Sequence, residues 1–114
     1  MNQGEIWLIN LDPAVGAEIK KARPAVIVNN NTLGRLPLKI IVPLTDWKEN
    51  YAVAPWMIKI DPDDQNNLTK ISAIDCFQVR SISELRFVKH IGNVNDGIFE
   101  RIKEGLAKVL SISF

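Results

Sequence analysis

The sequence predicts a small, mainly β domain that ends in one α-helix. Short apolar runs, separated by Pro, Gly, Asn and Asp, fill about the first four-fifths of the 114 residues. The last part of the chain changes to the spacing of an amphipathic helix. Because the gaps between the runs are of hairpin length, the strands should pair antiparallel in a small barrel or sandwich.

The expected strands follow the apolar runs in chain order. The first, residues 4–11, is apolar on both faces, because Ile6 and Leu8 alternate with other apolar side chains. β-Branched residues dominate the second run, and Asn and Gly supply turn chemistry after it. The second and later strands are expected over residues 23–30, 38–45, 56–60, 71–80 and 87–91.

Asn95 and Asp96 mark the start of the expected helix. Asn95 is a good N-cap, and the carboxylate of Asp96 suits the positive end of the helix dipole. The apolar residues that repeat at helical spacing are Ile98, Phe99, Ile102, Leu106, Val109 and Leu110. We expect this helix to cover one end of the barrel.

Length and composition indicate one domain over residues 1–114. With 46% hydrophobic and 24% charged residues, the chain can bury a core without disulfides or metals. Its single cysteine, Cys76, cannot form an internal disulfide, which favours a reducing compartment. Neither a signal peptide nor an apolar run of membrane-spanning length is recognisable. We therefore expect a soluble cytoplasmic protein that does not enter a membrane.

The charge balance excludes a protein that coats duplex nucleic acid. Fourteen basic and thirteen acidic residues give a net charge of +1, so any nucleic-acid site must be local. The chain has one histidine, His90, and its carboxylates do not cluster at metal-ligand spacing. We expect no metal and no cofactor, and the residue count excludes acid–base catalysis by two histidines.

Two strand ends carry the residues best suited to chemistry. Arg23 and Pro24 open the second strand, and Thr45 closes the third. Proline disfavours the helical region for the residue before it, so Arg23 should be extended. If the two strands are adjacent, the guanidinium and the threonine hydroxyl could hold one phosphate and stabilise charge that develops on phosphorus. Two long polar segments, residues 12–22 and 61–69, are further places where binding functions tend to lie.

An ordered set of motifs resembles the MazF/PemK family of toxin endoribonucleases. The set covers nearly the whole chain, and its order is more specific than any one motif. It comprises Gly4-Glu5-Ile6-Trp7, Leu11-Asp12-Pro13, Gly16, Glu18, Arg23-Pro24-Ala25-Val26-Ile27-Val28, Val42-Pro43-Leu44-Thr45, Gln78-Val79-Arg80, Ile91-Gly92 and the closing helix. The resemblance implies an α+β fold, in which a small Src-homology-3-like antiparallel β-barrel of the CcdB/PemK type is closed by a C-terminal α-helix.

The resemblance also implies an activity and partners. It implies metal-independent, sequence-selective cleavage of single-stranded RNA by attack of the 2′-hydroxyl, which leaves 2′,3′-cyclic phosphate and 5′-hydroxyl ends. It implies a homodimer, for which the doubly apolar first strand of a small domain is a separate reason. A cognate antitoxin, acidic and partly disordered, should fold across the RNA groove.

Carried over by position, the resemblance assigns roles to single residues. Arg23 would stabilise charge and donate a proton, Thr45 would hold the scissile phosphate, and Glu18 would be a candidate base. The side chains expected to contact RNA, from the family pattern or from their chemistry, are Lys20, Lys21, Trp47, Trp56, Gln78 and Arg80. Where the Kid/PemK branch has an aspartate before this Gln, the chain has Phe77, which argues against proton transfer at that position.

These side chains also have structural interpretations. Arg23 could be a solvated strand-end residue and Thr45 a turn cap, the two lysines could be a solvated pair, and Trp56 could be a dimer contact. Asp75 should point inward, first as a hydrogen-bonded structural acid and second as a catalytic one. The pattern places Phe77 and the small Cys76 in the core.

Two other functions compete with RNA cleavage. A protein of the same fold could poison DNA gyrase without catalysis, as CcdB does through a helix that ends in Trp-Gly-Ile. This chain instead ends in Ser111-Ile112-Ser113-Phe114 and carries the Arg23–Thr45 pair, which favours the nuclease. An inactive family member that only binds RNA or antitoxin is the third hypothesis, against which the intact pair also argues.

Overall fold

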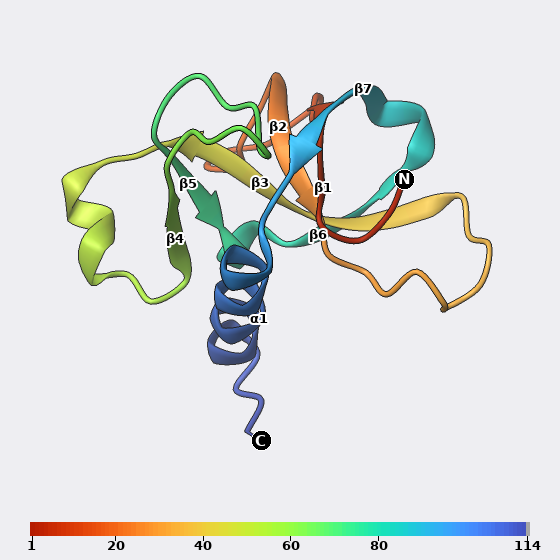
Figure 1. Cartoon of the computed structure of the whole chain (residues 1–114). Coiled ribbons are helices and arrows are strands. Elements are labelled where there is room, and N and C mark those ends of the chain that lie inside the picture. The colour runs from red at the N-terminus through yellow and green to blue at the C-terminus, as the bar shows by residue number, and fades with distance from the viewer. Residues whose placement is uncertain (114) are drawn as a thin grey trace.

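A computed structural model describes residues 1–113, which form seven strands, three short 3-10 turns and one α-helix (Figure 1). The strands are β1 (Glu5–Asn10), β2 (Ala22–Ile27), β3 (Leu38–Asp46), β4 (Met57–Ile60), β5 (Ser72–Asp75), β6 (Arg80–Ser83) and β7 (Phe87–Asn93). The turns are η1 (Glu49–Val53), η2 (Cys76–Gln78) and η3 (Glu84–Arg86), and the helix is α1 (Asp96–Val109). Within these residues, no helix is both long and apolar enough to cross a membrane.

The strands form one antiparallel sheet in which β3 is shared. The order is β4-β5-β3-β2-β1-β7, and β6 pairs with β3 beside this path. The first half of β3 faces β6, with Leu38 opposite Ser83, and the second half faces β5, with Leu44 opposite Ile74. The predicted β architecture with a C-terminal helix is confirmed, but hydrogen bonds do not close the sheet into a complete barrel.

The sheet has an apolar cluster on each side. One cluster, which includes Ile6, Val26 and Ile102, packs between the sheet and α1. The other gathers around Ile9 on the opposite face. Both Ile6 and Ile9 are fully buried, so the two apolar faces of β1 are satisfied within the chain. The apolarity of both faces of β1 is therefore no separate reason for a homodimer, because the chain's own two cores account for it.

The strand predicted over residues 71–80 is interrupted by η2. The Asp75 carboxylate accepts a hydrogen bond from the Phe77 backbone N–H at 3.1 Å and caps this turn. The turn breaks the alternation of a strand, so Cys76 is fully buried while the Phe77 side chain is 65% exposed. The placement of Phe77 in the core is therefore wrong, and those of Cys76 and Asp75 inside the protein are confirmed.

The helix begins and packs as its sequence predicts. The Asn95 side chain accepts a hydrogen bond from the Ile98 N–H at 2.8 Å. The buried face of α1 includes Ile102 and Gly105, and it contacts β4 and η2, below the sheet in Figure 1. Gly105 lies directly over Cys76, whose pKa burial raises to about 12, with a smaller contribution from the charge of Asp75.

Replacing Gly105 by alanine tests how closely α1 packs on η2. A Cβ there would lie 2.9 Å from the Cys76 sulfur. Alanine favours a helix by roughly 0.5–1 kcal/mol, but overpacking costs about 1–3 kcal/mol. We expect Gly105→Ala to lower the free energy of unfolding by about 1 kcal/mol, measured by urea denaturation.

The double variant Cys76→Ala/Gly105→Ala supplies the control. Without the sulfur, the new methyl group should stabilise the helix relative to Cys76→Ala alone. The same effect of Gly105→Ala in both backgrounds would contradict the close contact.

Candidate active site

The pairing of β2 with β3 brings Arg23 and Thr45 together. Ala25 lies opposite Pro43, and the same register extended by two residues places Arg23 opposite Thr45. The two side chains are half-buried and line one small cavity of about 60 Å³. The expected adjacency of the two strands is confirmed.

Local structure fixes the Arg23 backbone and leaves much of its side chain available. Arg23 pairs with Ile9 of β1, and Pro24 follows it in the strand. Its Nε donates to the Lys20 carbonyl at 3.4 Å. No carboxylate among residues 1–113 lies within 4 Å of the guanidinium, so the paired terminal nitrogens can meet an anion.

An ion pair between Asp46 and Lys70 forms part of the same cavity. The Lys70 ammonium lies 2.7 Å from an Asp46 carboxylate oxygen. This hydrogen bond and the charge of Lys70 lower the pKa of Asp46, and Arg23 and Lys48 lower it further. With two cations against one carboxylate, the cavity lining has an excess positive charge.

Neither Asp46 nor Lys70 was among the residues predicted from the sequence. Asp46 directly follows Thr45, and Lys70 directly follows the polar 61–69 crossing that the core did not explain. That crossing also contributes Thr69 to the cavity lining. The polarity of residues 61–69 thus indicated that this segment lies at a binding site, but it did not indicate that Lys70 pairs with Asp46.

A second, larger groove lies beside this cavity. Its volume is about 530 Å³, and it is lined by Leu11, Ala17, Glu18, Ile19, Pro43, Phe77, Gln78, Val79 and Arg80. Three of the predicted site residues, Glu18, Gln78 and Arg80, line this groove. Arg23 and Thr45 line the smaller cavity instead. One Glu18 oxygen accepts from the Val15 N–H at 2.6 Å, within its own loop.

Gln78 ties the 12–22 loop to the end of β5. Its side-chain oxygen accepts from the Ile19 N–H at 2.7 Å, and its side-chain nitrogen donates to Asp75 at 3.1 Å. Asp75 is only 4% exposed, and this burial raises the pKa of its carboxyl despite the hydrogen bonds that it accepts. The amide of Gln78 is thus held between two partners of fixed polarity.

The remaining predicted RNA contacts line neither of these two hollows. Lys20 and Lys21 are exposed on the 12–22 loop. Trp47 packs edge-on against Tyr51 and lies under the Lys59 ammonium. Trp56 belongs to a different pair, because its ring centre is 5.9 Å from that of Phe77, which lines the larger groove. The two tryptophans therefore belong to separate aromatic pairs.

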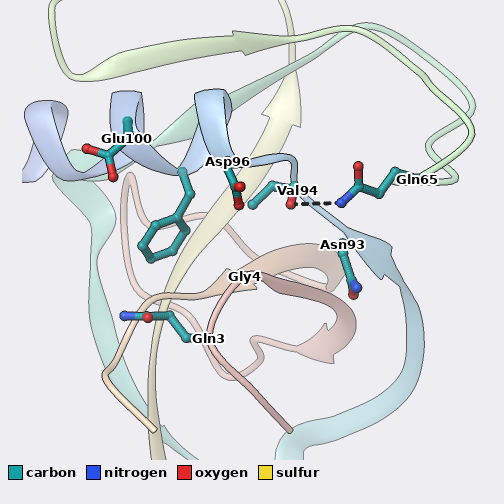
Figure 2. Close-up of a pocket in the computed structure, with 8 residues that line it drawn as sticks. Gln3, Gly4, Gln65, Asn93, Val94, Asp96 and Glu100 are labelled. Carbon is teal, nitrogen blue, oxygen red and sulfur yellow. Dashed lines mark hydrogen bonds between the residues drawn. The ribbon is translucent and has the colours of Figure 1, made fainter.

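Another pocket, of about 490 Å³, has the wrong charge for a phosphodiester. Figure 2 shows the carboxylates of Asp96 and Glu100 on α1 and, on the other side of Val94, Gln65, whose amide donates to the Val94 carbonyl at 3.4 Å. Its lining residues are Gln3, Gly4, Gln65, Asn93, Val94, Asp96, Phe99 and Glu100, with no Lys or Arg among them. This pocket therefore suits an anionic substrate less well than the β2–β3 strand ends do.

Comparison with known proteins decides the family. The model of the PemK-like, MazF-like toxins of type II toxin–antitoxin systems matches residues 2–110. The chain belongs to this family. It is 35% identical to the endoribonuclease MazF9 of Mycobacterium tuberculosis, over 93% of this chain and 92% of that protein. It is 28% identical to the endoribonuclease PemK of Escherichia coli, over 97% and 83% of the two chains.

Solved structures of MazF proteins share the fold. MazF from Deinococcus radiodurans superposes with a TM-score of 0.81 and 18% identity, covering 97% of this chain and 96% of that one. A mycobacterial endoribonuclease in complex with its cognate antitoxin gives a TM-score of 0.78 and 19% identity, covering 100% and 98%. The prediction of a toxin endoribonuclease of the MazF/PemK family is thus confirmed.

The substitution Asp75→Asn tests whether Gln78 links Asp75 to the 12–22 loop through hydrogen bonds of fixed direction. The asparagine oxygen can still accept from the Phe77 N–H, but its nitrogen would then face the Gln78 nitrogen, donor against donor. If Gln78 turned over, its nitrogen would face the Ile19 N–H instead. One hydrogen bond in the series Asp75–Gln78–Ile19 is lost either way, which weakens the attachment of the 12–22 loop, so the Ile19 amide should exchange with solvent about 3- to 10-fold faster. An unchanged rate at Ile19, or an equal rise at the buried Val26 amide, would contradict this loop attachment.

The buried Asp75 carboxyl should also make stability depend on pH. Burial raises the pKa of this carboxyl in the folded protein above the usual 3.8. As pH rises above 3.8, Asp75 therefore loses its proton more readily in the unfolded chain than in the folded protein. The contribution of Asp75 to stability therefore falls as pH rises through this range. We expect the stability of wild type relative to Asp75→Asn, from urea unfolding, to decline as pH rises above about 4, the usual range of an aspartate pKa. A constant difference would mean that the carboxyl is not perturbed.

Proposed function

We propose that this toxin cleaves single-stranded RNA at a phosphodiester held by Arg23 and Thr45. The observation that carries the proposal is that both side chains line one accessible cavity with excess positive charge. The cavity is far smaller than the neighbouring groove, about 60 against 530 Å³, which suits a phosphate better than a nucleobase. The names of the endoribonuclease relatives point the same way.

The cleavage uses the substrate's own 2′-hydroxyl as nucleophile. A bond forms between the 2′-oxygen and phosphorus while the bond to the 5′-oxygen breaks, leaving a 2′,3′-cyclic phosphate. The 2′-hydroxyl loses its proton and the departing 5′-oxygen gains one, so both atoms and charge balance. Arg23 stabilises the charge on the phosphoryl oxygens through paired donors, and Thr45 donates a further hydrogen bond.

We propose that the reaction requires no metal ion. Arg23 supplies a permanent positive charge at the phosphate, and Lys70 pairs with Asp46, so that the carboxylate of the cavity does not neutralise Arg23. Arg23 thus provides the electrostatic stabilisation for which other nucleases use a cation. The identity of the base is a separate question, and Glu18 remains a candidate that the 12–22 loop would have to bring closer.

We further propose a cytoplasmic homodimer that a cognate antitoxin inhibits. Exposed Leu38 and Ile40 on the outer face of β3 offer apolar surface for a second copy. An acidic segment would be attracted to the cations around Arg23, and the mycobacterial endoribonuclease of the same fold forms a complex with its own antitoxin. The unpaired, buried Cys76 thiol is compatible with a reducing compartment.

RNA cleavage by purified protein tests the proposed site. In a chelating buffer, wild type should cut single-stranded RNA, and Arg23→Ala should reduce the rate at least 100-fold, as removal of an oxyanion-stabilising donor does elsewhere. End analysis should find 2′,3′-cyclic phosphate and 5′-hydroxyl ends. Light scattering should give about twice the chain mass of 12.8 kDa for both proteins.

Arg35→Ala is the matched control. Arg35 is exposed in the connection between β2 and β3 and lines neither hollow, so its loss should leave cleavage unchanged. Full activity in Arg23→Ala would refute the catalytic assignment. Intact RNA together with inhibited gyrase would favour the non-catalytic alternative instead.

A further inference from the structure

We propose that the 530 Å³ groove binds one unpaired base next to the scissile phosphate, stacked on Phe77. Phe77 would then select the position of cleavage without taking part in the chemistry. This inference rests on the proposed ribonuclease function and names a subsite within it. Three features support it: an aromatic ring held outward, the walls of the groove, and the spacing of the groove from Arg23 and Thr45.

The Phe77 ring is exposed because the backbone holds it so. It projects from η2, where the Phe77 N–H is bound by Asp75 and the neighbouring Cys76 takes the interior position. Trp56, itself 37% exposed, supports the ring with a centre-to-centre distance of 5.9 Å. A large apolar ring without a polar atom gains nothing from contact with water, whereas a base can stack on it. The ring is thus a preformed platform.

The groove has an apolar floor and polar edges. Leu11, Pro43 and Val79 contribute apolar surface, which suits the flat faces of a base. Glu18 and Gln78 contribute hydrogen-bonding groups, which suit its edges. The groove lining carries one carboxylate, Glu18, and one guanidinium, Arg80, so unlike the neighbouring cavity it has no excess positive charge.

Another part of the groove wall is held by the same turn that presents the ring. Ile19 belongs to this wall, and Gln78 holds its N–H at 2.7 Å. Gln78 is in turn held by Asp75, which caps η2. Both parts of the wall are therefore ordered before any ligand arrives, which reduces the entropic cost of binding.

Residues two positions apart on β3 line the groove and the phosphate cavity. Pro43 lines the groove, and Thr45, two residues further along β3 on the same face, lines the cavity. Two residues of strand span roughly 7 Å, which is on the scale of the step from a phosphate to an adjoining base. Arg80 also lines the groove, and within the described part of the chain it forms no ion pair. It can therefore neutralise the next phosphate.

RNA binding measured with Phe77 variants tests this subsite. The probe is a single-stranded oligonucleotide that carries the mapped cleavage sequence, with a 2′-deoxy sugar at the cleaved position so that it stays whole. Stacking on one aromatic ring changes affinity by roughly 10- to 100-fold. We expect Phe77→Ala and Phe77→Leu to weaken binding by that factor, and Phe77→Trp to retain it.

An abasic site in the RNA identifies the base involved. Removal of one base beside the scissile phosphate should weaken binding to wild type as much as Phe77→Ala does, with no further loss when both changes are combined. Leu85→Ala is the matched control, because Leu85 is 95% exposed and does not line the groove. It should bind RNA like wild type.

Three outcomes would overturn the inference. The inference fails if the loss of RNA affinity caused by Phe77→Ala is additive with the loss caused by every abasic site, because the ring then contacts no base. Unchanged RNA affinity in Phe77→Ala, with a lower dimer mass or weaker antitoxin binding, would assign the groove to a protein partner. Wild type that neither binds nor cuts RNA would remove the proposed function itself, whereas loss of cutting in Arg23→Ala alone leaves that function standing.

Discussion

The antiparallel register between β2 and β3 is the constraint on which the candidate site depends. It sets Arg23 opposite Thr45, at the end of a strand pair whose central residues, Val26 and Val42, are fully buried. Because side chains alternate between the two faces of a strand, a slip of one residue would send the guanidinium to the other side of the sheet. Core packing therefore fixes the geometry of the site, although these central residues do not line the cavity.

β3 extends this constraint to the rest of the molecule. Its first half pairs with β6 and its second half with β5, so one strand of nine residues organises both parts of the open sheet. The turn η2 joins these two partners, and its cap, Asp75, reaches the 12–22 loop through Gln78. The charged cavity, the larger groove and the loop are thus coupled through a few backbone elements rather than through a network of charges.

Sequence patterns predicted the features that follow from local physics. The β-branched run after Arg23, the proline that restricts Arg23, and the Asn95 cap each act over a few residues, and each lies where its pattern indicates. The exposure of Phe77 could not be predicted in this way, since a single turn changes the period on which the prediction relied. The Asp46–Lys70 pair was also missed, because its partners meet only through the sheet, 24 residues apart in sequence. Both faces of β1 are apolar for a similar reason: they serve two cores of the same chain.

The placement of Pro43 and Thr45 on one strand limits how such an enzyme can diverge. Substitutions around the groove can change which base is accepted, as loops and side chains are free to vary. In the proposed arrangement, the offset between the accepted base and the broken bond follows from the two-residue separation of Pro43 and Thr45 along the extended strand. Variants of this scaffold would then acquire new target sequences while cutting at the same place relative to the base that they read.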